Sequence, residues 1–518
     1  MDLDPRSCYR ALCGRDARFD GRLFVGVRTT GVYCRPICPA RTPKREHVQF
    51  FPTAAAAQEA GFRPCLRCRP ETAPDLAAWR GTSNTVARAL ALIERGGLDE
   101  DMVDGLAGRL GIGERQLRRL FRQHLGASPI AVAQTRRVLL AKQLIHDTSL
   151  AMSEIALAAG FGSIRRFNET FQHLYHRPPS ELRRSMRAAR SPGGEEVTLR
   201  LPYRRPYDWE AMLAFLRARA IQGLEAVDEE GYTRTFALEG THGVLRVRPA
   251  AGDALAVTVR CARLSALPSV IARVRRLFDL SADPEVIGAQ LSEDPRLARL
   301  VAARPGLRVP GGWDGFEVGV RAVLGQQITV TAAAKLGAVL LRTCGEPLAL
   351  ASGDAGGLTH VFPTPASVAA LDPALLPMPR ARARALVGLA RTVADDPRVF
   401  GAGRTLDEVV ARLRRIDGIG PWTAQYVAMR ELHEPDAFPA GDVGLRRALA
   451  GHDGPRPTAA ELERYAERWR PWRAYAAQYL WTTAGAGTPP SRESAHRARR
   501  TSSSARGTRR RPPGTAVR

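Results

Sequence analysis

The chain has 518 residues, which is too long for one hydrophobic core, so we expect several domains of about 100 to 200 residues. Its formal net charge of +25 favours a polyanion such as nucleic acid as partner, and we find no apolar segment long enough to span a membrane. All but three of the 77 basic residues are arginine, which leaves Lys44, Lys142 and Lys335 for any mechanism that needs a Schiff-base lysine. Half of the eight cysteines are clustered and no signal segment begins the chain, so we expect a reducing, cytoplasmic location.

Two close cysteine pairs distinguish the first segment. Cys34 and Cys38 are followed after 26 residues by Cys65 and Cys68, a spacing that allows four thiolates to bind one zinc ion tetrahedrally. The surrounding sequence predicts only short strands and one short helix, 54–60, so this small core depends on its metal. Spacing alone leaves two alternatives open: a purely structural zinc, or a zinc that holds a reactive thiolate.

The stretches 31–41 and 60–70, GVYCRPICPAR and AGFRPCLRCRP, closely resemble the methylphosphotriester-sensing domain of Ada-type regulators. The resemblance implies that Cys34 accepts a methyl group from DNA and that Cys38, Cys65 and Cys68 are its zinc co-ligands. Methylation of one thiolate removes a negative charge from the site and so reduces its repulsion from DNA phosphates. Seven basic side chains near the cysteines are candidates to hold the DNA backbone: Arg35, Arg41, Lys44, Arg45, Arg63, Arg67 and Arg69.

A helix, a glycine-bearing turn and an arginine-rich helix are predicted over 106–121 and again over 155–167, with a linking helix at 130–146. The pair resembles the AraC-type DNA-binding domain. That resemblance implies that the second helix of each unit enters the major groove of DNA. The candidate contacts are Arg115, Gln116, Arg118 and Arg119 in the first unit and Ser163, Arg165, Arg166 and Asn168 in the second.

After a linker at 191–196, the pattern predicts four strands, at 197–201, 233–238, 243–249 and 254–259, with a helix at 209–219. From Leu267 to Leu480 the pattern is helical. Gly418-Ile419-Gly420 predicts a tight turn whose backbone N–H groups cradle a phosphate, and Asp442 follows some twenty residues later. Together with 319–327, 362–365 and 465–473, these residues resemble the helix-hairpin-helix glycosylase superfamily, and most closely its AlkA-type DNA-3-methyladenine glycosylases II.

The resemblance implies a role for several residues of this last segment. Asp442 is the implied catalytic carboxylate, and Trp422, Tyr426 and Trp481 match aromatic positions of the base pocket. Gln327 stands where the best-known AlkA enzyme inserts a leucine into the duplex. Because Trp422 also occupies the place of the lysine that bifunctional relatives carry, we expect a monofunctional glycosylase without strand cleavage.

The sequence therefore predicts a multidomain fold. The expected parts are a zinc-stapled α+β domain at 1–81, an all-α AraC-type double helix-turn-helix at 82–190, an α+β unit at 191–265, an all-α helix-hairpin-helix glycosylase at 266–487 and a disordered arginine-rich tail at 488–518. The expected function is an adaptive response to DNA alkylation: irreversible methyl transfer to Cys34, promoter binding, and excision of bases such as 3-methyladenine. The expected partners are alkylated DNA, promoter DNA and RNA polymerase, on the nucleoid. Two alternatives stay open, namely a regulator with a non-catalytic glycosylase-like module and a glycosylase with a purely structural zinc.

Overall fold

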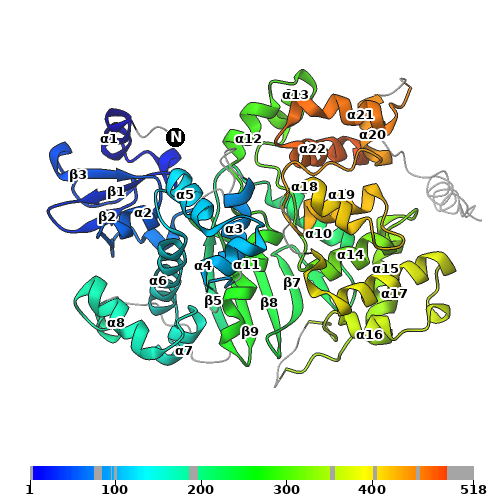
Figure 1. Ribbon diagram of the computed structural model, residues 1–518, viewed down its shortest axis with the longest axis horizontal. Helices are drawn as coiled ribbons and strands as arrows, with labels where there is room; N and C mark the ends of the chain where they lie inside the picture. Colours follow the sequence, from blue (N-terminus) through cyan, green and yellow to red (C-terminus); the bar gives the residue numbers. More distant parts are fainter. Residues whose placement is uncertain are drawn as a thin grey trace, which may run out of the picture.

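A computed structural model describes residues 4–74, 84–94, 96–98, 102–185, 196–350, 356–400, 405–450 and 455–486 (Figure 1). Most of the predicted linker and the predicted arginine-rich tail lie outside these ranges, apart from Glu196, which begins the first strand after the linker. Within them, no helix combines the length and the apolar character that a bilayer crossing requires. We call residues 4–185 the sensor–regulator half and residues 196–486 the glycosylase half, after the resemblances given above.

A four-stranded sheet of order β3-β1-β2-β4 forms the first domain. Its elements are α1 (Pro5–Cys13), β1 (Phe24–Val27), β2 (Val32–Cys34), β3 (Val48–Phe51), α2 (Ala54–Glu59) and β4 (Arg63–Pro64), with 3-10 turns at Ala17–Phe19, Arg45–His47 and Pro70–Thr72. β1 pairs antiparallel with β2 and β3, while β2 and β4 pair parallel. The parallel pairing brings the ends of β2 and β4 together, and these ends carry the first cysteine of each pair.

Among the described residues up to Ser185, seven helices follow. They are α3 (Asn84–Glu94), α4 (Val103–Arg109), α5 (Glu114–Leu125), α6 (Pro129–Asp147), α7 (Met152–Ala158), α8 (Ile164–Tyr175) and α9 (Pro179–Ser185). α4–α5 and α7–α8 are the two predicted helix-turn-helix units, and α6 is the predicted linking helix. Apolar positions of the two units are buried as predicted, among them Leu117, Phe121 and Phe171 on the helices and Phe161 in the second turn.

The glycosylase half begins with an antiparallel sheet of order β5-β9-β8-β7-β6. Its strands are β5 (Glu196–Pro202), β6 (Glu225–Val227), β7 (Tyr232–Leu238), β8 (Thr241–Ala250) and β9 (Ala254–Cys261), with α10 (Trp209–Arg219) between β5 and β6. The sequence pattern predicts four of these strands and misses β6. β6 is a three-residue edge strand, too short to show an alternating pattern.

Helices make up the rest of the described chain. They are α11 (Leu267–Leu277), α12 (Pro284–Leu291), α13 (Pro295–Ala303), α14 (Gly315–Leu324), α15 (Val330–Cys344), α16 (Pro365–Ala369), α17 (Arg380–Asp395), α18 (Leu406–Leu413), α19 (Pro421–Arg430), α20 (Val443–Ala450), α21 (Ala459–Ala466) and α22 (Arg473–Ala486). Further 3-10 turns lie at Leu264–Ala266, Pro373–Leu375, Pro397–Phe400 and Glu467–Trp469. One large buried cluster unites α14, α17, α19 and α22, and it supports the predicted hairpin between α18 and α19.

Candidate metal centre and candidate glycosylase site

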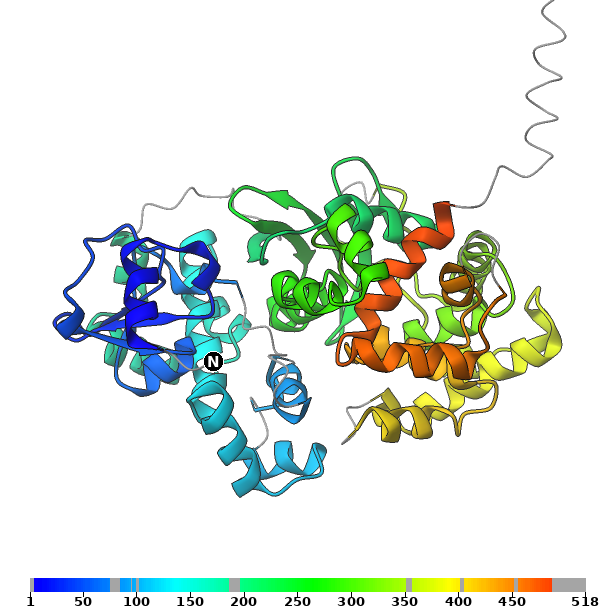
Figure 2. The ribbon, with the colours of Figure 1, turned by 90° about the horizontal axis from the view of Figure 1, so that it is seen from above.

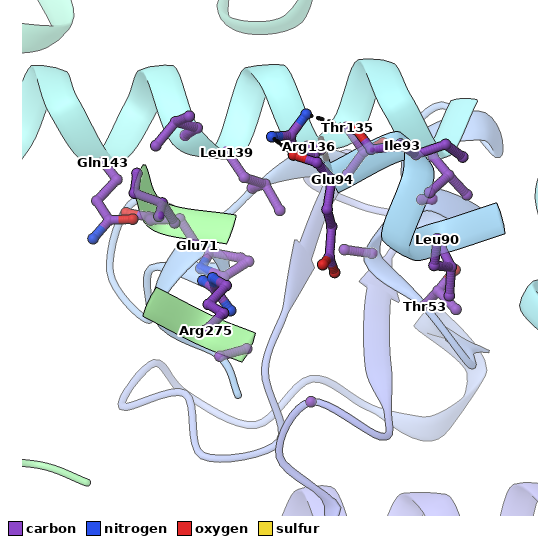
Figure 3. Close-up of a pocket in the computed structure, with 18 of the residues that line it drawn as sticks. Thr53, Glu71, Leu90, Ile93, Glu94, Thr135, Arg136, Leu139, Gln143 and Arg275 are labelled. Carbon is purple, nitrogen blue, oxygen red and sulfur yellow. Dashed lines mark hydrogen bonds between the residues drawn. The ribbon is translucent and has the colours of Figure 1, made fainter. Parts of the chain in front are cut away.

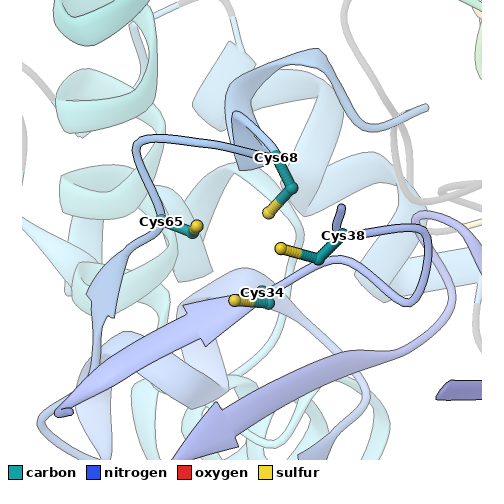
Figure 4. A group of neighbouring side chains, drawn as sticks. All are labelled: Cys34, Cys38, Cys65 and Cys68. Atoms are coloured by element: carbon teal, nitrogen blue, oxygen red, sulfur yellow. The ribbon is translucent and has the colours of Figure 1, made fainter. Parts of the chain in front are cut away.

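Four cysteine side chains converge where β2 and β4 end (Figure 4). The Sγ atoms of Cys34, Cys38, Cys65 and Cys68 all lie within 4.8 Å of one another. Cys38, Cys65 and Cys68 are buried, whereas Cys34 is only partly buried. The structure thus brings together all four predicted ligands, and it makes Cys34 the most accessible of them.

The donor set fits a metal ion. The backbone N–H of Arg35 donates to Sγ of Cys68 at 3.3 Å, and that of Arg67 donates to Sγ of Cys65 at 3.4 Å. Such bonds favour the thiolate form of a cysteine. Four thiolates this close repel one another unless a cation lies between them, and a four-cysteine cluster is a closed structural arrangement for zinc.

Two of the seven basic residues predicted to hold DNA are instead used inside the protein. Arg35 donates from Nε to Asp20 at 2.8 Å and from Nη1 to Thr72 at 2.7 Å, with little of its side chain exposed. Arg69 forms ion pairs with Glu71 and Asp147. A guanidinium already satisfied by a carboxylate is a poor phosphate ligand, so for these two the prediction is wrong. Arg63 is half-buried, and the side chains that stay exposed are Arg41, Lys44, Arg45 and Arg67.

A buried lysine joins the metal centre to the linking helix. Lys142 of α6 is 1% exposed; its Nζ donates to the backbone carbonyl of Cys65 at 2.9 Å and to Glu71 at 2.6 Å. Arg69–Asp147 joins the same two elements. The sequence contained one signal for this contact, a lone lysine in an arginine-rich chain, but no signal for its partner.

The candidate base contacts of the two helix-turn-helix units all lie on the surface. Arg115, Gln116, Arg118 and Arg119 are exposed on α5, and Ser163, Arg165, Arg166 and Asn168 are exposed at the start of α8. Arg118 pairs with Glu114, and Arg165 pairs with Glu169, each one helical turn away. Exposed pairs of this kind contribute under about 1 kcal/mol, so both arginines remain available to DNA.

Three hydrogen bonds hold the carboxylate of Asp442. Oδ1 accepts from the indole N–H of Trp481 at 2.9 Å and from the backbone N–H of Leu445 at 3.0 Å. Oδ2 accepts from the indole N–H of Trp422 at 3.0 Å. Together the three donors fix the orientation of the carboxylate. Gly444 makes this packing possible, because a Cβ there would lie 3.0 Å from Oδ1.

Aromatic rings surround the carboxylate. Trp422 and Tyr426 stack with ring centroids 5.1 Å apart and planes 12° apart. Behind them the buried guanidinium of Arg430 lies 5.2 Å from the ring of Tyr426 and 5.4 Å from that of Trp481. Burial alone would raise the pKa of Tyr426, but Arg430 and Arg219 lower it overall. All three predicted pocket aromatics are therefore brought together around Asp442.

The two turns predicted to contact DNA, the hairpin at 418–420 and the turn that carries Gln327, lie beside each other. Gly418 has a φ of +81°, and a Cβ there would lie 2.3 Å from Cβ of Ala385, so only glycine fits. Gly420 is exposed and caps α19. Gln326 donates to the carbonyl of Gly418 at 2.9 Å, which ties the hairpin to the turn that carries Gln327. Gln327 is exposed with a φ of +58°, so its side chain is free to face a duplex.

Four family models match consecutive parts of the chain. They are the metal binding domain of Ada at residues 7–71, a helix-turn-helix domain at 106–185, the AlkA N-terminal domain at 198–314 and the HhH-GPD superfamily base excision DNA repair protein at 320–474. A Mycobacterium tuberculosis protein named "Probable bifunctional transcriptional activator/DNA repair enzyme AlkA" is 43% identical over 93% of this chain and 97% of its own length. The chain belongs to the bifunctional AlkA family.

Other relatives of this bifunctional AlkA family member match only part of it. DNA-3-methyladenine glycosylase 2 of Escherichia coli is 37% identical over 55% of this chain and 97% of its own length. Among solved structures, the 3-methyladenine DNA-glycosylase from Archaeoglobus fulgidus covers 55% of this chain and 98% of its own, with 22% identity and a TM-score of 0.49.

The family assignment confirms three predictions made from the sequence: the multidomain fold, the helix-turn-helix DNA-binding region and zinc as the metal of the four-cysteine cluster. Sequence reasoning missed the hydrogen bonds from Trp422 and Trp481 to Asp442, since both tryptophans were predicted only as pocket walls. It also missed Arg430 and Gln326. Gln326 lies within the quoted 319–327 motif, where its position beside Gln327 was the available signal.

Proposed function

We propose that this chain senses DNA alkylation, activates transcription in response and removes alkylated bases. The observation that carries the enzymatic part is the carboxylate of Asp442, held by two indole N–H groups inside an aromatic pocket. The observation that carries the sensing part is the convergence of four cysteine Sγ atoms, in which Cys34 is the residue with the largest exposed fraction. The name of the M. tuberculosis relative, which pairs transcriptional activation with DNA repair, supports both parts.

In the glycosylase half, we infer hydrolysis of the N-glycosidic bond of 3-methyladenine and related bases. The flipped base lies against Trp422, Tyr426 and Trp481, whose ring faces attract a cationic alkylated base by roughly 1 to 2 kcal/mol. The C1′–N bond breaks and its electron pair leaves with the base, while the Asp442 carboxylate stabilises the positive charge that develops at C1′. Water then adds at C1′ and loses its proton to Asp442 or to solvent.

We infer that the reaction stops there, without a strand-cleaving step. A Schiff base needs a lysine amine near C1′, and Trp422 occupies the hairpin position where bifunctional relatives carry one. Lys335 is exposed on α15, Lys142 is buried against Glu71, and Lys44 belongs to the first domain. The DNA product is therefore an intact strand with an abasic site.

In the sensor, Cys34 is the proposed methyl acceptor. Bound zinc keeps the four thiolates deprotonated at neutral pH. The Cys34 sulfur attacks the methyl carbon of a methylphosphotriester, the carbon–oxygen bond breaks, and its electron pair stays on the phosphate oxygen. The products are a thioether at Cys34 and an ordinary phosphodiester, so each chain reacts once.

The loss of one negative charge allows the exposed Arg41, Lys44, Arg45 and Arg67 to hold DNA more strongly. Promoter binding by α5 and α8, with Arg115, Arg118, Arg119, Arg165 and Arg166, then follows. We propose recruitment of RNA polymerase as the next step and the cytoplasmic nucleoid as the place of action.

Two assays test the proposal. The intact chain should release 3-methyladenine from alkylated duplex DNA, and Asp442→Asn should lower the rate by about 100-fold or more while leaving DNA binding unchanged. No release by the intact chain would favour the alternative of a non-catalytic module. Binding to promoter DNA should tighten after exposure to methylphosphotriester DNA, and unchanged binding would favour a purely structural zinc.

A further inference from the structure

The boundary between the two halves is apolar. α6 contacts β5, and α7 contacts the turn Leu264–Ala266. Buried Leu144 and Ile155 of the sensor–regulator half belong to the same continuous cluster as Val197 and Leu199 of the glycosylase half. Interfaces between domains of one chain are usually small and polar and permit relative motion, whereas an apolar interface that continues a core does not.

One buried and one part-buried ion pair cross the same boundary. Arg88 of α3 donates to Glu434 at 2.6 Å, and the two side chains are only 5% and 3% exposed. Arg22 of the first domain pairs with Asp283, the N-cap residue of α12. A buried charge without its partner is costly, so the Arg88–Glu434 pair specifies one arrangement of the two halves.

A polar contact and a shared cavity also lie at this boundary. Gln143 of α6 donates to the backbone carbonyl of Arg200 on β5 at 2.9 Å. A cavity of about 200 Å³ has walls from the first domain, α3, α6 and α11 (Figure 3). The carboxylate of Glu94 and the guanidinium of Arg275 approach it from opposite halves, and burial lowers the pKa of Arg275 to about 10. The first domain, the helices of the helix-turn-helix region and the glycosylase half therefore all line this one cavity.

We propose that the glycosylase half carries a docking surface for the chain's own sensor–regulator half, anchored by Asp283 and Glu434, and that the two halves form one body. The partner is the basic face that presents Arg22 and Arg88, together with the apolar side of α6 and α7. The views in Figures 1 and 2 place α3 and α11 next to each other, in agreement with their contacts.

A short series of contacts connects the neighbour of the methyl acceptor Cys34 to the interface between the two halves. Asp20 accepts from Arg35, the neighbour of Cys34, and two residues later Arg22 reaches Asp283. Gly21 between them has a φ of +71°, and a Cβ there would lie 2.2 Å from the Pro74 carbonyl oxygen, so the turn is closely fitted. A three-residue turn thus links the ion pair of Arg35, the neighbour of Cys34, to the ion pair with the glycosylase half.

The test is small-angle X-ray scattering and calorimetry on the full chain, and it is independent of either activity. The scattering profile of the wild-type protein should match the docked arrangement, and its two halves should unfold together in one thermal transition. Arg88→Glu and Glu434→Arg should each increase the radius of gyration and separate the thermal transitions, and the double exchange should reverse both effects. Arg18→Glu, an equal charge change at a side chain that is 74% exposed, should change neither.

Two results would overturn the docking surface. One is a wild-type scattering profile that fits only two independently moving halves, a measurement that needs no variant to fold. The other is an Arg88→Glu protein that folds and matches Arg18→Glu in both size and transitions.

Discussion

The indole N–H of Trp481 donates to Oδ1 of Asp442 at 2.9 Å, and the two residues are 39 positions apart in the sequence. Trp422 makes the equivalent bond to Oδ2 at 3.0 Å. The carboxylate thus has one orientation relative to the stacked rings, and that orientation decides where it can stabilise positive charge. A hydrogen bond to a charged group contributes about 1.5 to 3 kcal/mol.

Trp481→Phe keeps a ring in the pocket but removes this donor. We expect kcat for 3-methyladenine release to fall by roughly tenfold, the equivalent of about 1.4 kcal/mol, with a smaller change in KM. Trp469→Phe is the matched control, because Trp469 donates the same kind of bond to Asp294 at 2.9 Å, away from Asp442. It should lower thermal stability and leave kcat unchanged; equal losses of kcat in both variants would contradict the positioning role.

Sodium borohydride should trap no covalent complex between the protein and DNA. Trapping requires a lysine Schiff base at C1′, and the hairpin position that carries this lysine in bifunctional relatives is occupied by Trp422. A bifunctional glycosylase run in parallel shows that the reagent works. Any trapped complex would contradict the proposal. The variant among Lys335→Ala, Lys142→Ala and Lys44→Ala in which trapping disappears would then identify the lysine that forms the Schiff base.

Lys142→Met should loosen the first domain from α6. The substitution removes the ammonium that Glu71 and the Cys65 carbonyl share at a site 1% exposed. Breaking a buried pair in this way costs about 3 to 5 kcal/mol. Chemical denaturation should show that loss in the sensor–regulator half. Lys335→Met, the same change at an exposed lysine, should leave the free energy of unfolding within about 0.5 kcal/mol of wild type.

Glu431→Gln should stabilise the protein at alkaline pH. Burial raises the pKa of Glu431 to about 7 from its ordinary 4.5, although Arg276 and Arg273 offset part of the effect. The carboxyl therefore destabilises the fold above pH 4.5, and fully so above pH 7, by on the order of 3 kcal/mol. The advantage of the variant in Tm should be absent near pH 4.5 and grow up to pH 8. A constant advantage across that range would contradict the assignment.

Most of the site residues could be predicted because they lie in short sequence motifs. The four cysteines lie in two short motifs, and the parallel pairing of β2 with β4 is all that the fold adds to bring them together. Asp442 and the hairpin glycines were likewise found from neighbouring residues. Ion pairs such as Arg22–Asp283, which joins residues 261 positions apart, leave no local trace, and neither does the internal use of Arg35. Surface arginines and buried arginines have the same sequence signature in a chain this rich in arginine.

The central claim is that Cys34 accepts the methyl group, whereas Cys38, Cys65 and Cys68 serve only as zinc ligands. Peptide mass analysis after incubation with methylphosphotriester DNA tests it directly. We predict one added methyl group on the peptide that contains Cys34, and none on the peptide that contains Cys65 and Cys68; fragmentation should place it on Cys34 rather than Cys38. An unmodified Cys34 in zinc-loaded, folded protein would contradict the claim.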